Sequence, residues 1–225
     1  MIGYGEINMR VYTCEQHCVD GSTNTQWLDL RAGHFTGSDF HQYMGIAKTG
    51  KLSETAKKEL YKKVLENFGY RFETPQSPAM LIGIEREPIA RDAYRFIYEK
   101  DVREVGFIDK EELHAGCSPD GIICDGNKIT EIIEIKCPSV ETFVSYLDDE
   151  FMKPEYETQM QFNMFVTGAD VCHFVVYHPD FKLIVRDVKK DPEIQEKIKF
   201  VLEQLNGMYD KLYNKVDKQR LEIEE

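Results

Sequence analysis

The 225-residue sequence has no long apolar run and no basic leader segment. No stretch reaches the roughly 18 apolar residues of a membrane-spanning helix, so we expect none. The first residues, MIGYGEINMRVYT, lack a basic segment followed by an apolar one, which predicts that no Sec-type signal is present. Internal repeats, low-complexity tracts and Gly/Ser-rich linkers are also missing. We therefore expect one folded domain over residues 1–225.

The sequence also has fewer basic than acidic residues. The chain carries 40 Asp and Glu against 28 Lys and Arg, a formal net charge of −12 at pH 7. This balance argues against a general basic coat for nucleic acid or membranes, but it is compatible with a local basic surface. Lysines are densest at positions 48, 51, 57, 58, 62 and 63, where they indicate either the solvated side of a helix or a track for a DNA backbone. The six cysteines, without a secretory signal, are interpreted as intracellular thiols.

Residues 1–100 are predicted to be mostly helical. Ser53 is a capping residue for a helix that runs to about Phe68. A second helix is expected from Leu81 to about Lys100. It should kink or break at Pro88, because proline lacks the backbone N–H and its ring crowds the preceding turn.

Residues 101–190 carry the strand signals. Strands are predicted over 102–108, 113–124, 128–136, 171–177 and 183–188, with a helix over 155–166. Asp125-Gly126-Asn127 has the chemistry of a hairpin turn between the second and third of these strands. A final helix over 191–217 begins at the N-cap Asp191. This order predicts an α/β or α+β fold in which helices flank one central mixed sheet.

Two short segments carry the candidate chemistry, Ser118-Pro119-Asp120-Gly121 and Glu134-Ile135-Lys136. Glu134 and Lys136 are two apart on a strand and point the same way, and Asp120 reaches the same patch if the strands form a hairpin. Asp120, Glu134 and the Ile135 carbonyl would offer oxygen ligands to Mg²⁺, and Lys136 would orient a water or stabilise charge on a phosphate. The alternatives are a solvated ion pair on a strand and an ordinary Pro-Asp turn.

The combination matches the PD-(D/E)xK nuclease signature, with Glu134 fourteen residues after Asp120. The longer strings Gly116-Cys117-Ser118-Pro119-Asp120-Gly121 and Glu134-Ile135-Lys136-Cys137-Pro138 resemble the lambda exonuclease and YqaJ-type viral recombinase family. Further elements resemble that family in the same order: Trp27-Leu28-Asp29-Leu30-Arg31-Ala32-Gly33 with Thr36-Gly37-Ser38, then Gly83-Ile84-Glu85-Arg86-Glu87, then Gln159-Met160-Gln161. The resemblance covers about residues 27–167 and implies a restriction-endonuclease-like core.

The resemblance also implies roles for individual residues. Arg31 and Ser38 would hold the 5′-phosphate of the strand being degraded, and Ser118 would touch phosphate as well. Glu87 would complete the metal site, with Glu85 as its competitor, so that two Mg²⁺ ions, replaceable by Mn²⁺, are expected.

The glutamine motif and Trp27 have their own implied roles. Gln161, or with less support Gln159, would contact the scissile phosphate or the attacking water. Trp27 is expected to pack rather than to stack on a base.

The function implied by the resemblance is a Mg²⁺-dependent 5′-to-3′ exonuclease. It would digest one strand of double-stranded DNA from a 5′-phosphorylated end and leave 3′ overhangs for phage-type recombination by single-strand annealing. A ring-shaped homotrimer, a single-strand annealing protein as partner and the cytoplasm of a bacterial host are further expectations. Such a ring would place the acidic surplus outside and basic residues along the DNA channel.

Two alternatives to this interpretation stay open. The same metal core would serve an endonuclease or a junction resolvase. The net charge would suit a non-enzymatic DNA mimic or a protein-binding module. Separately, Cys14, His17 and Cys18 have a spacing that suggests a metal site, although no partner ligands are evident.

Overall fold

The computed structural model describes residues 9–18, 22–72, 76–147 and 152–220. Its first elements are β1 (Arg10–Tyr12), α1 (Thr25–Arg31), β2 (Phe35–Thr36), α2 (Gly37–Phe40), α3 (Ile46–Thr49), α4 (Glu54–Glu66) and α5 (Pro78–Tyr98). They are followed by β3 (Phe107–Lys110), η1 (Glu111–Leu113), β4 (Ala115–Cys117), β5 (Gly121–Asp125), β6 (Lys128–Lys136), α6 (Val140–Ser145), α7 (Pro154–Thr167), β7 (Val171–Val176), β8 (Ile184–Lys189) and α8 (Pro192–Asp217). Within these described ranges, no helix is long and apolar enough to cross a membrane.

Local capping chemistry sets the starts of two long helices. The Ser53 hydroxyl accepts the third backbone N–H after it at 3.1 Å, at the start of α4. The Asp191 carboxylate accepts two backbone N–H groups of the first turn of α8, at 2.8 and 3.1 Å. Both helix starts are therefore confirmed as predicted from the sequence.

Helix α5 is continuous through Pro88, so of the kink or break expected there the break is wrong, and the kink stays a prediction. Proline removes one hydrogen bond from the helix. Ala90 and Tyr94, which follow it, are buried in a small apolar core against β6 and β7. This packing outweighs the lost bond, because most helix stability in a folded protein comes from burial of one face.

Two four-stranded sheets replace the one central sheet that the sequence predicts. The first has the order β1-β3-β4-β2 and the second the order β5-β6-β7-β8. In the second sheet, β5 and β6 form an antiparallel hairpin, β7 runs parallel to β6, and β8 runs antiparallel to β7. The mixed α/β class is confirmed, whereas the single sheet is a wrong prediction.

The division between the sheets falls at the bend Ser118–Asp120. The strand predicted over 113–124 is in fact β4 and β5, with this bend between them. Pro119 has no N–H to give to a strand ladder, so a central strand does not run through it. The first sheet is completed by β1 and β2, from the part of the chain that was predicted to be helical.

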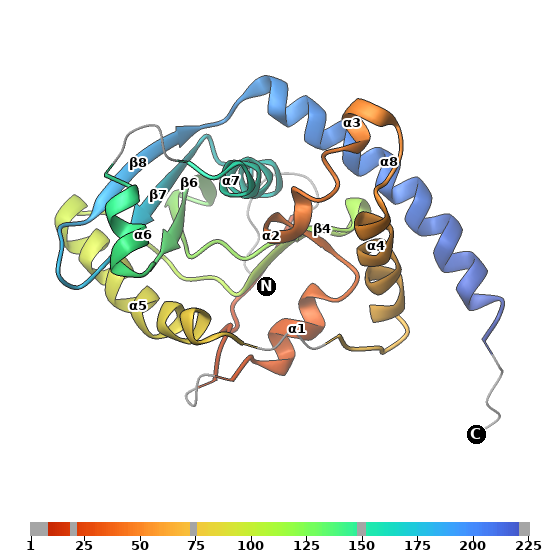
Figure 1. Ribbon diagram of the computed structural model, residues 1–225, viewed down its shortest axis with the longest axis horizontal. Helices are drawn as coiled ribbons and strands as arrows, with labels where there is room; N and C mark the ends of the chain where they lie inside the picture. The colour runs from red at the N-terminus through yellow and green to blue at the C-terminus, as the bar shows by residue number, and fades with distance from the viewer. Residues whose placement is uncertain (1–8, 19–21, 73–75, 148–151, 221–225) are drawn as a thin grey trace.

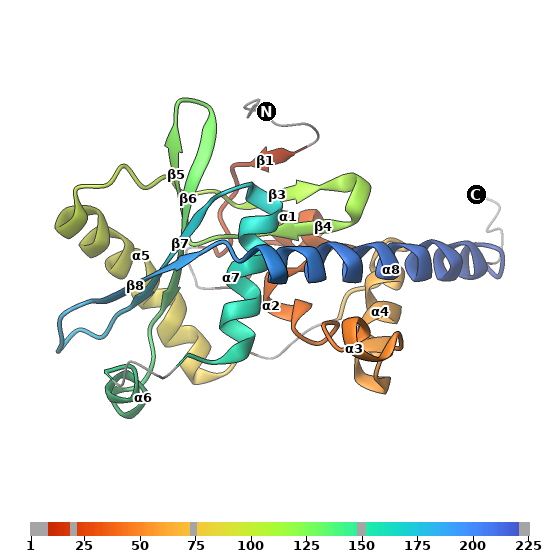
Figure 2. The ribbon, with the colours of Figure 1, turned by 90° about the horizontal axis from the view of Figure 1, so that it is seen from above.

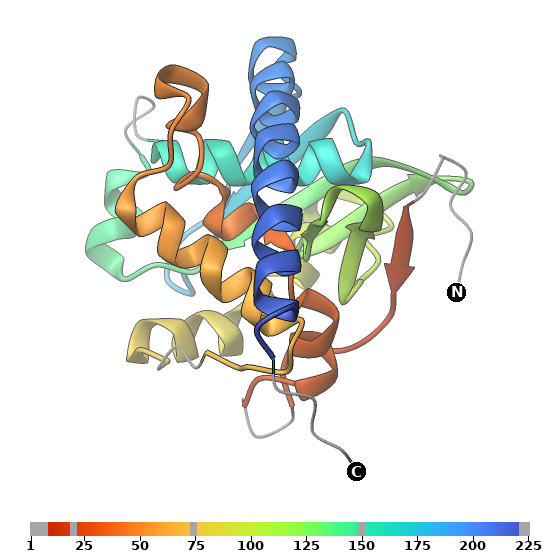
Figure 3. The ribbon, with the colours of Figure 1, turned by 90° about the vertical axis from the view of Figure 1, so that its right-hand side faces the viewer.

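Helices cover both faces of the second sheet. Helix α7 packs against β6 and β7 and also reaches β3 and β4 of the first sheet, while α5 packs on β6 and β7 from the opposite side (Figures 1 and 2). Ile132 of β6 lies in the main core with α7, whereas Ile133 and Ile135 lie in the smaller core with α5. Helix α8 lies across α7 and α4 (Figure 3). The face of β6 that carries Glu134 therefore points toward α7.

Candidate active site

Asp120 is held at the bend between the two sheets, beside β6. Its backbone N–H donates to the Ile133 carbonyl at 3.0 Å. Its carboxylate accepts the backbone N–H of Ile135 at 2.5 Å. These two bonds lock Asp120 against the strand that carries the second half of the motif, so the hairpin brings the two predicted segments together.

Glu134 is a buried carboxylate, only 2% exposed, and it is surrounded by donors. Lys136 Nζ and Gln159 Nε2 each donate to its Oε1 at 2.6 Å. Asn163 Nδ2 donates to its Oε2 at 3.4 Å. Since a buried charge is costly unless it is paired and hydrogen-bonded, these donors explain how the sheet tolerates Glu134.

The charges of this cluster shift its pKa values. Burial, reinforced by the charges of Glu87 and Glu134, raises the pKa of Asp120 well above its ordinary value. Burial would lower the pKa of Lys136, but the charges of Glu134 and Asp120 outweigh it and raise that pKa. Lys136 is therefore a permanent ammonium, 5.0 Å from the centre of the Tyr156 ring.

Glu87 on α5 joins this electrostatic cluster, and Glu85 does not. Burial raises the pKa of Glu87, the nearby Arg91 opposes this, and the charge of Glu134 adds to the increase. Arg91 forms an ion pair with Glu87 and donates from Nε to the Asp120 carbonyl at 2.6 Å. Glu85 is exposed, although it lines the same cavity as Glu87. The surroundings thus favour Glu87 over its competitor.

The donor chemistry of these residues fits a hard divalent cation. Asp120, Glu87 and Glu134 offer carboxylate oxygens, the ligand type that Mg²⁺ prefers, and their mutual repulsion is the kind that a cation offsets. Among the described residues, however, no three His, Cys, Asp or Glu side chains converge closely enough to hold an ion as they stand. Glu134 is turned toward Lys136 and Gln159, and Glu87 toward Arg91.

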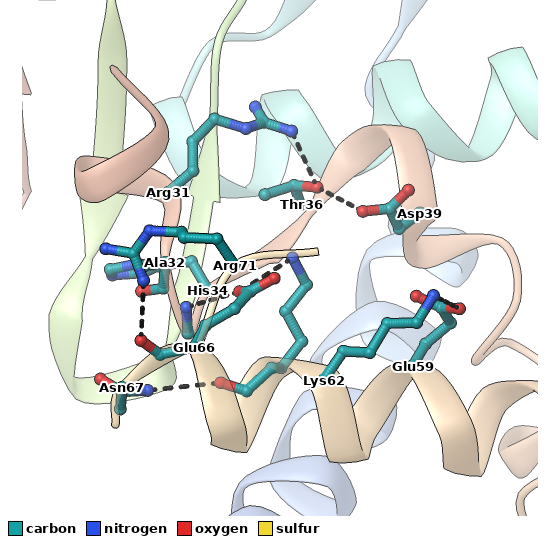
Figure 4. A network of polar contacts seen from close by, with 12 residues as sticks. Arg31, Ala32, His34, Thr36, Asp39, Glu59, Lys62, Glu66, Asn67 and Arg71 are labelled. Carbon is teal, nitrogen blue, oxygen red and sulfur yellow. Dashed lines mark hydrogen bonds and ion pairs between the residues drawn. The ribbon is translucent and has the colours of Figure 1, made fainter. Parts of the chain in front are cut away.

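Arg31 contacts Ser118, which lies two residues before Asp120 in the chain. Its guanidinium donates to the hydroxyls of Ser118 at 3.4 Å and Thr36 at 3.3 Å, and it lies over the Trp27 ring at 4.2 Å. The Ser38 hydroxyl lies 3.3 Å from that of Thr36. Figure 4 shows the chain of contacts from Arg31 through Thr36 to Asp39.

Arg31 has hydroxyl partners but no ion pair with a carboxylate within the part of the chain that the structure describes. Burial lowers its pKa, which is the direction expected of a cation without a close counter-ion. Trp27 packs, as expected, and donates from Nε1 to the Ser118 hydroxyl and the Gly106 carbonyl, both at 3.0 Å. Its ring lies against the Arg31 guanidinium. A guanidinium among hydroxyls is suited to bind an anion.

The two glutamines of α7 lie in different surroundings. Gln159 donates to Glu134 and so belongs to the site. Gln161 is buried on another side, where it donates to the Lys189 carbonyl at 2.8 Å and accepts the Asp191 N–H at 3.0 Å. The structure therefore brings Gln159, and not the preferred Gln161, together with the carboxylates.

Sequence reasoning missed Asn163, Arg91 and Thr36 as parts of the site. The glycine in Thr36-Gly37-Ser38 was a usable signal, because a Cβ at Gly37 would lie 2.2 Å from the Asn163 side-chain oxygen. The position thus needs glycine so that α2 approaches α7. Arg91 had a weaker signal, its spacing of four residues from Glu87 on one helix.

Similarity to known proteins bears on this site. The sequence profile of the YqaJ-like viral recombinase domain matches residues 26–170. The chain belongs to this family. Its YqaJ-like region includes Arg31, Glu87, Asp120, Glu134 and both glutamines. No curated protein matches the sequence.

Solved structures similar to this YqaJ-like protein include exonucleases. An alkaline exonuclease from Laribacter hongkongensis, also solved in complex with dAMP, is 28% identical, with a TM-score of 0.69; the alignment covers 88% of this chain and 100% of that one. A phage-related exonuclease from Haemophilus somnus 129PT is 20% identical, with a TM-score of 0.58 and coverage of 81% and 96%. The second likeness shows the fold alone.

The remaining candidates of the YqaJ-like chain are less suited to ligands. Three of the six clustered lysines pair with glutamates of α4 at 2.6, 2.8 and 3.5 Å: Lys57 with Glu54, Lys62 with Glu59, and Lys63 with Glu66. For these three, the solvated face of a helix is the better interpretation. Cys14, His17 and Cys18 lie in one loop, but the described residues contain no metal-binding cluster there.

Proposed function

We propose that this protein is a Mg²⁺-dependent 5′-to-3′ exonuclease that digests one strand of double-stranded DNA from a 5′-phosphorylated end. The observation that carries the proposal is that the bend Ser118–Asp120 connects the anion site at Arg31 to the carboxylate site. Ser118 contacts Arg31, and two residues later Asp120 lies against Glu134 and its strand. Family membership and the similarity to alkaline exonucleases support a deoxyribonuclease.

Asp120, Glu134, Glu87 and the Ile135 carbonyl would hold the divalent ions. Bound Mg²⁺ would polarise the phosphoryl oxygen and lower the pKa of a water. We expect two ions, and we expect Mn²⁺ to substitute, because it also accepts carboxylate and water ligands. Binding requires Glu134 and Glu87 to turn from their present partners, Lys136 and Arg91.

The chain's own groups would then position the reacting phosphate. Lys136 stays protonated and would stabilise charge on the phosphate or orient the attacking water. Gln159, which already donates to the Glu134 carboxylate, would contact the same water or phosphate. Gln161 has no such access in its present place, and we retain it only as a support of α7.

The anion site at Arg31 supports the 5′ polarity that we propose. Arg31 would bind the terminal 5′-phosphate, with the hydroxyls of Ser118, Thr36 and Ser38 completing the pocket. Two residues of extended chain span at most about 7 Å. The terminal phosphate and the scissile phosphate would therefore be neighbours on the strand, and the product would be a mononucleotide.

The wider role that we propose is phage-type recombination. The 3′ overhangs left by the enzyme would be substrates for a single-strand annealing protein, in the cytoplasm of a bacterial host. We propose a homotrimeric ring around the DNA, with the basic residues facing its channel. The exposed apolar side chains of α5 support such an assembly.

A nuclease assay tests the proposal. The substrate is a duplex carrying one 5′-phosphate and a label at either end of the phosphorylated strand, with Mg²⁺ or with a chelator. We expect wild type to release mononucleotides from the 5′ side only, and Lys136→Ala to lose about a hundredfold or more in rate. Arg31→Gln should lose the preference for a 5′-phosphate over a 5′-hydroxyl.

The same assay separates the alternatives. Cleavage of covalently closed circular DNA would favour an endonuclease or a junction resolvase. Absence of any Mg²⁺-dependent release of nucleotides would favour a DNA mimic or a protein-binding module. Equal rates for wild type and Lys136→Ala would contradict the proposed roles of the site residues.

A further inference from the structure

A cavity of about 770 Å³ opens beside the carboxylates, and its two walls differ in origin. One wall is α5 with Pro119 and Asp120, inside the region that the family profile matches. The other is the loop Thr13–Cys18, which precedes the matched residues. The volume falls in the range of about 300–1,000 Å³ that small ligands occupy in proteins. The loop thus forms one wall of the cavity and lies outside the residues that the family profile matches.

The loop is firmly built into the protein. Gly106 donates its N–H to the Tyr12 carbonyl at 2.8 Å, and Asn24 donates its N–H to the Gln16 carbonyl at 3.0 Å. A Cβ at Gly106 would lie 2.3 Å from both the carbonyl oxygen and the sulfur of Cys14. The backbone at Gly106 therefore lets the loop pack directly on the segment that leads to β3.

The charged groups that line the cavity are mostly negative, which disfavours a phosphate everywhere except beside Glu87 and Asp120, where the metal ions would bind. Besides Glu87 and Asp120, the lining includes the carboxylates of Glu15, Glu85 and Glu104. The guanidinium that lines it, Arg91, is engaged with Glu87, Glu104 and the Asp120 carbonyl. Carboxylates accept hydrogen bonds from the exocyclic amino groups of bases. An uncharged group that carries N–H donors is the ligand that this lining fits.

The rest of the lining suits a flat, partly apolar ligand. Leu81, Ile84 and Pro88 contribute apolar surface from α5. His17 contributes an imidazole whose buried Nδ1 has no hydrogen-bond partner among the described residues. Burial lowers the pKa of His17, so its ring is neutral near pH 7 and does not compete for phosphate.

We propose that the loop Thr13–Cys18 and the facing surface of α5 bind the nucleobase next to the reacting phosphate, and that they favour bases with an exocyclic amino group over thymine. The inference rests on the proposed exonuclease function, since that function brings a nucleotide to Asp120. The loop is then a determinant of sequence preference in a site whose chemistry is common to the family.

Photo-crosslinking tests the location. The slowed Lys136→Ala protein is irradiated with a 5′-phosphorylated duplex whose terminal nucleotide is 5-iododeoxycytidine, and the crosslinked peptide is sequenced by mass spectrometry. Crosslinks at residues 13–18 are expected. Crosslinks confined to other residues would overturn the inference.

Digestion rates test the preference. Two duplexes are compared that end in dA·dT and dT·dA, so that the terminal pair is equally strong and only the base at the 5′ end differs. We expect kcat/KM to be about fivefold or more higher for 5′-terminal dA, because a good base contact discriminates by about 1–3 kcal/mol. In the double variant Glu15→Met/Glu85→Met the ratio should approach one, whereas Glu203→Met on the exposed side of α8 should leave it unchanged.

The outcomes distinguish the two claims. A wild type that digests both ends equally keeps the proposed function and overturns the base preference. A ratio that survives the double variant overturns the role of the cavity carboxylates. A wild type that digests neither end overturns the proposed function itself.

Discussion

Hydrogen-bond donors on β6 and α7 hold the Glu134 side chain in place. A carboxylate that is 2% exposed is stable only because Lys136, Gln159 and Asn163 surround it. The same three donors compete with any cation that binds there. A cation can therefore bind to Glu134 only if these donors release its carboxylate.

Substitution of Gln159 and of Gln161 on α7 tests which of the two glutamines acts in the site. Gln159→Ala should lower kcat about tenfold or more, since a hydrogen bond to a charged group is worth about 1.5–3 kcal/mol. Gln161→Ala should leave kcat nearly unchanged and lower the free energy of unfolding by about 1–3 kcal/mol, because the buried Gln161 side chain is the partner of the Lys189 carbonyl and the Asp191 N–H. Steady-state kinetics and urea unfolding of both variants check this. The reverse pattern would restore Gln161 to the site.

Arg91 is a second residue whose loss has a defined cost. It is 5% exposed and pairs with Glu87 and Glu104. Arg91→Met should lower the free energy of unfolding by about 1–3 kcal/mol, because it leaves Glu87 and the Asp120 carbonyl without their donor. Arg95→Met, one turn further along α5 and more exposed, is the control and should cost less in urea unfolding.

The sequence could not reveal which glutamine faces Glu134. Two residues that are two apart on a helix lie on roughly opposite sides of it, and residues 160–164 of α7 are buried all round. A helix without a polar face gives no periodic signal for orientation. The β6 strand, the hairpin and the Asp191 cap were predictable, because alternation, turn chemistry and capping are local. Strands as short as β1 and β2 carry no such pattern.

At the scale of elements, the contact of α2 with α7 depends on Gly37. A Cβ there would lie 2.2 Å from the Asn163 side-chain oxygen and 3.2 Å from the Gln159 carbonyl. Gly37→Ala should therefore lower the free energy of unfolding by about 1–3 kcal/mol and also lower activity, by displacing the donors of Glu134. Gly45→Ala is the control, since a Cβ there meets nothing within 4 Å. Equal unfolding midpoints for both variants would contradict the close packing.

The attachment of β1 to β3 should depend on pH. Asp109 lies opposite Arg10 in the register and accepts from its Nε at 3.0 Å and its Nη2 at 2.7 Å. Burial would raise the pKa of Asp109, but hydrogen bonds from His34 and Arg10 outweigh it and hold that pKa below its usual range. A depressed pKa stabilises the fold above the ordinary Asp value of about 3.9, and this contribution is lost as pH falls below it.

Asp109→Asn tests this pH dependence. Wild type should lose stability in urea between pH 5 and pH 3, and the variant should start lower at pH 7 and lose less over the same interval. Asp125→Asn at the exposed tip of the β5–β6 hairpin removes the same charge and serves as the control. Parallel curves for wild type and Asp109→Asn would contradict the assignment.

At the scale of the whole molecule, α5 leaves much apolar surface uncovered. Its exposed side chains are Met80, Leu81, Ile82, Ile89, Phe96, Ile97 and Tyr98, and Phe96 is 86% exposed. Exposed apolar side chains in this number are typical of an interaction surface. In the proposed trimer, light scattering should give three times the 26.2 kDa of one chain.

Phe96→Glu probes that surface, because it places a charge in an apolar contact. It should reduce the mass toward 26.2 kDa without altering the circular dichroism spectrum. A wild-type mass of one chain, at concentrations where the enzyme is active, would refute the trimer. The net charge of −12 gives no argument against DNA in such an assembly, since only the channel must be basic.

The bend Ser118–Asp120 joins the last residue of one sheet, Cys117, to the first residue of the other, Gly121. Asp120 is bonded to β6, whereas Ser118 contacts Arg31. A displacement of the first sheet against the second would therefore shift Ser118 and Arg31 relative to Asp120 and Glu134. The bend acts as a mechanical coupling between the sheets. Substitutions in the core of the β1-β3-β4-β2 sheet, far from any phosphate, should consequently lower kcat more than they lower the free energy of unfolding.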